Sequence, residues 1–182
     1  MMPISQTDSL LYQSISLCML LSELHHKKFL ESSFYKENCF KNDNAVFKEI
    51  LSLSGGIGNP ATLQTMLYLL LVCPRESLNN IEKNKLDSTI NTFCNNLDSS
   101  TYSSSYQQDI PTINFSRHLR NAVAHSLCEF PSCGEMIFKD HDPKNPKECF
   151  EIKINSNNIE KLLELIQKQI IEFLNECYHP EK

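Results

Sequence analysis

The last third of the chain contains an apolar pattern that strongly constrains the fold. Apolar residues recur at helical spacing through the segment 159–174, namely Ile159, Leu162, Leu163, Ile166, Ile170, Phe173 and Leu174. Residues three, four and seven positions apart lie on one side of an α-helix, so this pattern predicts a long helix that buries one side. Asn157, with Glu160 three residues later, is typical of a helix start. Such a helix needs neighbouring elements to cover its apolar side.

Helical periodicity also runs through the first two thirds of the chain. It marks the segments 10–29, 44–53, 60–73, 81–97 and 112–127. Pro60 stands where a proline opens a helix, and Pro74 marks the end of the leucine-rich helix that follows. Three of the four glycines fall in 55–58. This cluster lacks the Lys-Ser/Thr of a phosphate-binding loop, so it predicts a turn between helices.

The apolar period changes from helical to alternating before the C-terminal helix. Residues 136–138 form a short apolar run, and between 150 and 154 apolar residues alternate with charged ones. Asp142-Pro143 and Asn145-Pro146 between the two segments are typical of turns. The pattern therefore predicts a β-hairpin.

A polar segment of low complexity, Asp-Ser-Ser-Thr-Tyr-Ser-Ser-Ser-Tyr-Gln-Gln, occupies residues 98–108. Neither the part of the chain before this segment nor the part after it looks able to fold as a separate domain. We therefore interpret the segment as a flexible insertion within a single domain, 1–182. The predicted fold is mainly α, a helical bundle with one small β-hairpin before the C-terminal helix.

Charge and cysteine content narrow the class of protein. The formal net charge of −5 argues against a protein that coats duplex nucleic acid, but it permits a nuclease with a few cations in one cleft. Several of the eight cysteines lie in helical patterns, where reduced cysteine acts as a small hydrophobic residue. We find no secretory signal and no apolar run long enough to span a bilayer. We therefore expect a cytoplasmic protein without a membrane segment.

A helical wheel of 115–127 places polar side chains opposite the apolar ones. The apolar side gathers Phe115, Leu119, Ala122, Val123 and Leu127, and the opposite side gathers Arg117, His118, Asn121 and His125. Arg120 lies at the border, about 140° from His125, so only its length would let it reach the same ligand.

This combination of residue types suits RNA cleavage by attack of a 2′-hydroxyl on the adjacent phosphate. A histidine can act as general base or acid, and an arginine offers a fork of donors to phosphate oxygens. An asparagine can orient either group, and no metal is needed. One helix offers one well-placed histidine, so a two-fold dimer would supply acid and base together. Alternatively, the stripe is a solvated surface, with Arg120 paired to a carboxylate of a neighbouring helix.

The segment Arg120-Asn121-Ala122-Val123-Ala124-His125 resembles the Arg-polar-x-x-x-His signature of the HEPN family. The order of elements after this segment, a hairpin followed by a closing helix, is similar to that in bacterial HEPN proteins of mobile elements and defence loci. The resemblance implies a HEPN-like helical bundle that acts as a metal-independent endoribonuclease and homodimer. It implies that Arg120 binds the scissile phosphate, His125 performs acid and base catalysis and Asn121 orients the reacting groups.

Arg117 and His118 are not part of that signature. The helical wheel adds them as candidate substrate-binding residues because they share the side of His125. The resemblance also allows a toxin or defence effector with an antitoxin or other regulatory partner. A non-catalytic HEPN module that binds nucleotide, RNA or a protein partner is the alternative.

Two further patterns receive weaker functional interpretations. Cys128 and Cys133, with His125, His141 and Cys149 nearby, do not match the usual spacing of zinc ligands, so we predict no metal and no cofactor. The run 25–28, His-His-Lys-Lys, is either a solvated helix end or a contact for RNA.

Overall fold

The computed structural model describes residues 6–40, 45–53, 56–131 and 134–178. The chain is mainly helical, with α1 (Gln6–His26), α2 (Ser33–Asn38), α3 (Ala45–Leu53), α4 (Pro60–Leu67), α5 (Pro74–Ser77), α6 (Asn80–Asn95), α7 (Phe115–Ala124) and α8 (Ser156–Tyr178). The strands are β1 (Tyr102–Ser104), β2 (Cys128–Glu129), β3 (Glu135–Asp142) and β4 (Asn145–Asn155). One turn of π-helix, η4 (Tyr68–Val72), continues α4. The predicted mainly α fold is confirmed.

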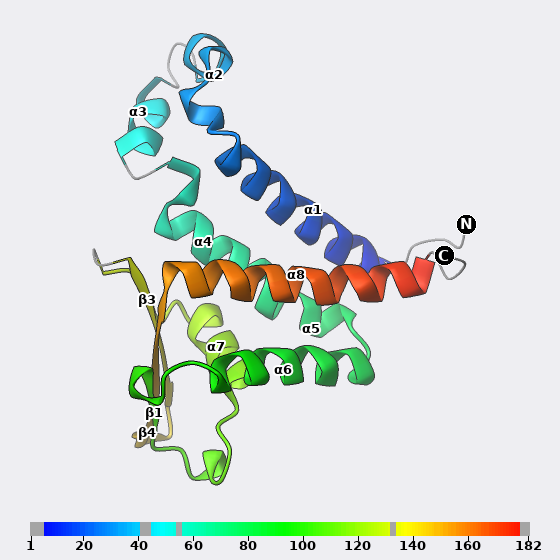
Figure 1. The fold of residues 1–182 in the computed structure, drawn as a ribbon, viewed down its shortest axis with the longest axis vertical. Helices are drawn as coiled ribbons and strands as arrows, with labels where there is room; N and C mark the ends of the chain where they lie inside the picture. The colour runs from blue at the N-terminus through cyan, green and yellow to red at the C-terminus, as the bar shows by residue number, and fades with distance from the viewer. Residues whose placement is uncertain (1–5, 41–44, 54–55, 132–133, 179–182) are drawn as a thin grey trace.

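The C-terminal helix α8 lies across the other helices (Figure 1) and contacts α1, α6, η4, β3 and β4. Its apolar stripe is buried as predicted, and Leu162 and Ile166 are completely inaccessible to solvent. The helix begins slightly earlier than expected, because the side chain of Asn155 accepts a hydrogen bond from the backbone N–H of Asn158. Asn155 therefore caps the helix in place of Asn157.

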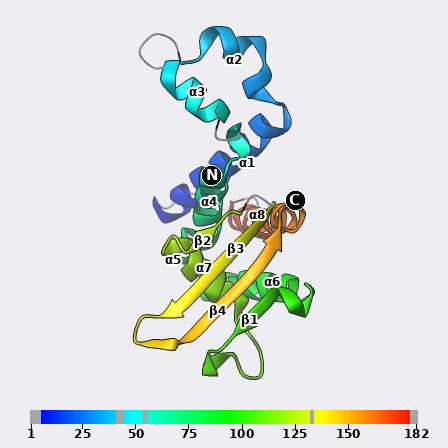
Figure 2. The same cartoon turned by 90° about the vertical axis from the view of Figure 1, so that its left-hand side faces the viewer.

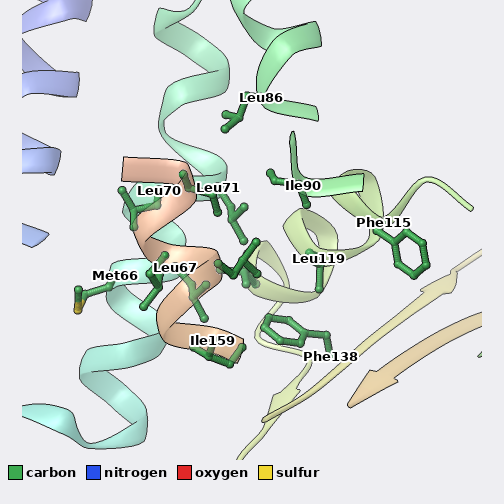
Figure 3. Close-up of a cluster of buried hydrophobic side chains, with 14 of the residues drawn as sticks. Met66, Leu67, Leu70, Leu71, Leu86, Ile90, Phe115, Leu119, Phe138 and Ile159 are labelled. Carbon is green, nitrogen blue, oxygen red and sulfur yellow. The ribbon is translucent and has the colours of Figure 1, made fainter. Parts of the chain in front are cut away.

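The hydrophobic core forms where α8, α4 with η4, α6, α7 and the sheet meet. Figure 3 shows side chains from each of these elements in one cluster, including Leu67, Leu70, Ile90, Leu119 and Phe138. The core therefore fixes α7 between helices on one side and the sheet on the other.

We expect Ile166→Ala to lower the free energy of unfolding by roughly 2–5 kcal/mol, because truncation in a packed core leaves a cavity. The matched control is Leu165→Ala on the same helix, whose side chain is 38% exposed. This control should change the free energy by less than about 1 kcal/mol. Urea unfolding followed by circular dichroism measures both variants. Equal losses for the two variants would contradict the burial of this stripe.

The predicted hairpin is the β3–β4 pair, with its turn at Pro143 and Lys144. It belongs to a larger antiparallel sheet in the order β1-β4-β3-β2, which lies at the opposite end of the molecule from α2 and α3 (Figure 2). Met136, Phe138 and Asp140 of β3 are buried on one face of this sheet. The same face of β4 presents Phe150, Ile152 and Ile154, and α7 packs against it.

The polar segment 98–108 is part of the fold and not the flexible insertion that its composition predicted. Tyr102 pairs with Ile152 and Ser104 with Phe150, so β1 covers an edge of β4 that would otherwise expose unpaired backbone groups. The Tyr102 ring meets the Phe115 ring edge-on, with centroids 4.9 Å apart. Tyr106 is also buried. Aromatic contacts thus fix a segment whose serines predicted mobility.

Near the end of α1, the short helices α2 and α3 form a lobe (Figures 1 and 2). The predicted helix 44–53 corresponds to α3, with residue 44 outside the described residues. None of the α3 side chains is buried, although Val46, Phe47, Ile50 and Leu53 are apolar. Within the described ranges, no helix is both long and apolar enough to cross a membrane.

Candidate functional site

The helix α7 is shorter than the predicted range 112–127. The side chain of Asn114 caps its start by accepting a hydrogen bond from the backbone N–H of Arg117 (3.1 Å). The helix ends where Ser126 adopts a left-handed conformation with φ of 56°. Backbone N–H groups of Ser126 and Leu127 then donate to the carbonyls of Val123 and Ala122, which forms a Schellman turn. His125 therefore sits at the exposed C-terminal end of α7.

The side chain of His118 is completely buried, so its predicted role as a substrate-binding residue is wrong. The helical wheel assumed that only the apolar side of α7 would be covered. In the fold the sheet also covers the flank at His118, and its ring stacks on the Phe150 ring at 4.3 Å and 11°. No substrate reaches His118 without separating α7 from the sheet.

Two buried carboxylates hold the His118 ring. Nδ1 lies 2.7 Å from Oδ2 of Asp140, and Nε2 lies 2.9 Å from Oδ2 of Asp109. Burial alone would raise the pKa of Asp140, but the hydrogen bonds from His118 and Asn121 outweigh it and hold the pKa below its usual value. The pKa of Asp109 is also lowered, because the hydrogen bond from Ser104 and the charge of His118 outweigh burial. Both carboxylates are therefore ionised near neutral pH.

Asp140 connects this buried cluster to the predicted site. Its Oδ2 accepts a second hydrogen bond from Nδ2 of Asn121, at 3.1 Å. Because the amide nitrogen is engaged by the carboxylate, the carbonyl oxygen of Asn121 is left to accept a hydrogen bond from a bound ligand. The amide orientation is thus fixed by the fold.

A cavity of about 460 Å³ lies beside Asn121 and His125. Arg117 lines it too, so three of the predicted site residues come together. Part of the wall is the tip of the β3–β4 hairpin. The Arg117 guanidinium is already engaged, 3.4 Å from Oδ1 of Asp109 and 5.1 Å from the centre of the Tyr106 ring.

Arg120 lines a different, narrow cleft, together with Arg75, Lys83 and Asp87. The Arg120 side chain is half-buried. Burial is the larger cause that lowers the pKa of its guanidinium, and the positive charge of Arg75 is the second. Asp87 forms its ion pair with Arg75 instead, at 3.8 Å between Nη1 and Oδ2. Among the described residues Arg120 has no ion pair, although the charge of Asp87 on the neighbouring helix α6 acts on it across the cleft. Within one chain, Arg120 and His125 therefore face separate spaces.

The sequence interpretation missed the two carboxylates of this site. Asp140 had a detectable signal, because it continues the alternation of Met136 and Phe138 and so occupies a core position of β3. A buried carboxylate at such a position requires a partner. Asp109 had no such signal, since it follows a segment interpreted as flexible.

The described part of the chain contains no cluster of three His, Cys, Asp or Glu residues placed to hold a metal ion. Cys133, which belonged to the zinc alternative, lies outside the described residues. Among the described cysteines, Cys18 and Cys94 are free and buried, and burial raises their pKa to about 11 and about 12. Such thiols are core residues and not reactive groups.

A family model described as HEPN pEK499 p136 matches residues 3–176. The chain belongs to the HEPN family. The family inferred from the segment Arg120–His125 is therefore confirmed, and it indicates a nuclease or RNA-related module in general terms. No curated protein matches this HEPN chain, and no solved structure does.

Acid sensitivity should reveal the buried pair in this HEPN protein. The pKa of Asp140 is lower in the folded chain than its ordinary value of about 3.9. Its ionised form therefore stabilises the fold above that value, and this contribution is lost as the pH falls below about 4. We expect Asp140→Asn to reduce the loss of unfolding free energy between about pH 5 and pH 2, measured by urea unfolding at each pH.

The control is Glu151→Gln on the neighbouring strand β4, a partly exposed carboxylate. It should keep most of the acid sensitivity of the parent. An unchanged pH profile for Asp140→Asn would contradict the role given to this carboxylate.

Proposed function

We propose that this HEPN protein is a metal-independent endoribonuclease. It would cleave RNA by attack of a ribose 2′-hydroxyl on the adjacent phosphate. The observation that carries the proposal is that Asn121, fixed by Asp140, and the exposed His125 border one cavity, while Arg120 of the same helix turn has no ion-pair partner in the described part of the chain. An anionic substrate would satisfy that guanidinium.

The chemistry assigns one task to each residue. His125 takes the proton from the 2′-hydroxyl or gives one to the departing 5′-oxygen. Arg120 binds the scissile phosphate and stabilises the charge that builds up on its oxygens. Asn121 orients the reacting groups through its free carbonyl. The products are a 2′,3′-cyclic phosphate and a free 5′-hydroxyl.

A homodimer around α7 would complete the site. One chain provides one exposed histidine in the segment, and its Arg120 does not line the cavity of His125. A two-fold axis beside α7 would bring two segments into one cleft, so that one His125 acts as base and the other as acid. We place this activity in the cytoplasm, in a toxin or defence effector. Arg117 would contribute to substrate affinity from the cavity wall.

The direct test incubates purified protein with RNA in excess chelator. Cleavage should persist, and His125→Ala should slow it on the order of 10²–10⁴-fold. Arg120→Ala should cause a comparable loss, and Arg120→Lys should restore little, because an ammonium group lacks the two-pronged geometry of guanidinium. The control Lys168→Ala, an exposed residue of α8, should keep the parent rate.

Two outcomes would contradict the proposal. Cleavage that returns only with added magnesium would indicate a different chemistry. Binding of RNA or nucleotide without any cleavage would instead support the alternative, a non-catalytic HEPN module.

The dimer is tested separately, with two differently tagged chains purified as a mixed dimer. If both His125 residues serve one cleft, a dimer of parent and His125→Ala chains should have far less than half the parent rate. Light scattering should give the mass of a dimer. Half the parent rate in the mixed dimer, or full activity of a monomer, would contradict the shared cleft.

A further inference from the structure

The cavity beside His125 has a chemistry that its proposed role in cleavage does not explain. We propose that it binds the nucleobase whose own ribose supplies the attacking 2′-hydroxyl, and that Glu148 selects guanine there. This inference rests on the proposed ribonuclease function and assigns the substrate preference of the same site.

The covalent structure of a nucleotide connects the cavity to His125. The base is attached to C1′ of the ribose, and the 2′-hydroxyl is on the next carbon. A base inside the cavity would therefore place the hydroxyl of its own nucleotide at the rim, near His125 and Asn121, which both line the cavity. The volume of about 460 Å³ is within the range of small-molecule sites.

The charge of the lining favours a base over a phosphate. Three carboxylates (Asp140, Asp142 and Glu148) line the cavity with one guanidinium, that of Arg117, and with the imidazoles of His125 and His141. Asp109 already pairs with this guanidinium. A phosphate inside the cavity would meet net negative charge, whereas a neutral base with N–H groups would find acceptors. The phosphate therefore remains at the rim.

Glu148 is the carboxylate best placed to read the base. Asp140 is occupied by His118 and Asn121, and Asp142 accepts a hydrogen bond from the backbone N–H of Lys144 at 2.7 Å, which fixes the hairpin turn. Within the described ranges Glu148 makes only one long contact, accepting from the backbone N–H of Gln107 at 3.4 Å. Its side chain lines the cavity together with Asn121 and His125.

Guanine matches a carboxylate better than the other bases do. Its N1–H and N2–H₂ groups are adjacent donors, and they can bond both carboxylate oxygens at once. Adenine and cytosine present one amino group beside an acceptor, and uracil presents one N–H between two acceptors. Either pattern places a lone pair against the second carboxylate oxygen. Leu127 and Pro143 supply apolar wall for the flat faces of the ring.

The first experiment uses RNA oligonucleotides that differ only in the base before a single scissile position. Cleavage after guanosine should exceed cleavage after the other three nucleosides by roughly 10–100-fold, the range of a good two-bond contact to a base. Glu148→Gln should remove most of this preference, and Glu148→Asp should keep part of it. Glu151→Gln, a nearby residue of β4 that pairs with Lys153, should keep it all. Cleavage by the parent without regard to this base would overturn the inference.

A binding experiment separates this inference from the proposed function. Calorimetry should show that guanosine 3′-monophosphate binds the full chain more tightly than uridine 3′-monophosphate does, and that Glu148→Gln removes the difference. If no RNA is cleaved but this preference is present, the base site holds and the ribonuclease proposal fails. If RNA is cleaved and the two nucleotides bind equally, the base site fails alone.

Discussion

The hydrogen bond between His118 and Asp140 joins α7 to the sheet, and the geometry of the candidate site depends on it. The two side chains are at most 5% exposed, and their atoms are 2.7 Å apart. A buried ionic pair is weak evidence for stability, because its desolvation offsets much of the attraction. The same carboxylate also holds the amide of Asn121. We therefore interpret the pair as a device that fixes a polar residue at the edge of a cavity.

The end of α7 provides the second half of this arrangement. The Schellman turn at Ser126 ends the helix at Ala124 with His125 as its C-cap, and the His125 side chain lines the cavity. Had the helix continued to 127, as its apolar pattern predicted, His125 would have occupied its last full turn. Asn121, whose amide is held by Asp140, and the exposed His125 thus come from adjacent turns at the end of α7. The hydrophobic core fixes the position of that helix.

Much of the fold could be predicted because the informative patterns are local. Apolar residues recur at helical spacing in α8 and at every second position in β4. The secondary structure of both elements therefore follows from the sequence. The separation of Arg120 from His125 also followed from helical geometry, and the two residues do line different cavities. The burial of His118 could not be predicted in this way. It depends on Asp109, in the preceding irregular segment, and on Asp140 of β3, which come together at His118 only when the sheet packs on α7.

In the proposed reaction the ribose 2′-hydroxyl is the nucleophile and no metal takes part. The most direct measurement compares two oligonucleotides in excess chelator, one all-ribose and one with a single 2′-deoxynucleotide before the position of cleavage. The first should be cut to a 2′,3′-cyclic phosphate and a 5′-hydroxyl, as identified by mass spectrometry, and the second should stay intact at that position. Cleavage of the deoxy position, or products with 3′-hydroxyl and 5′-phosphate ends, would contradict the proposed reaction.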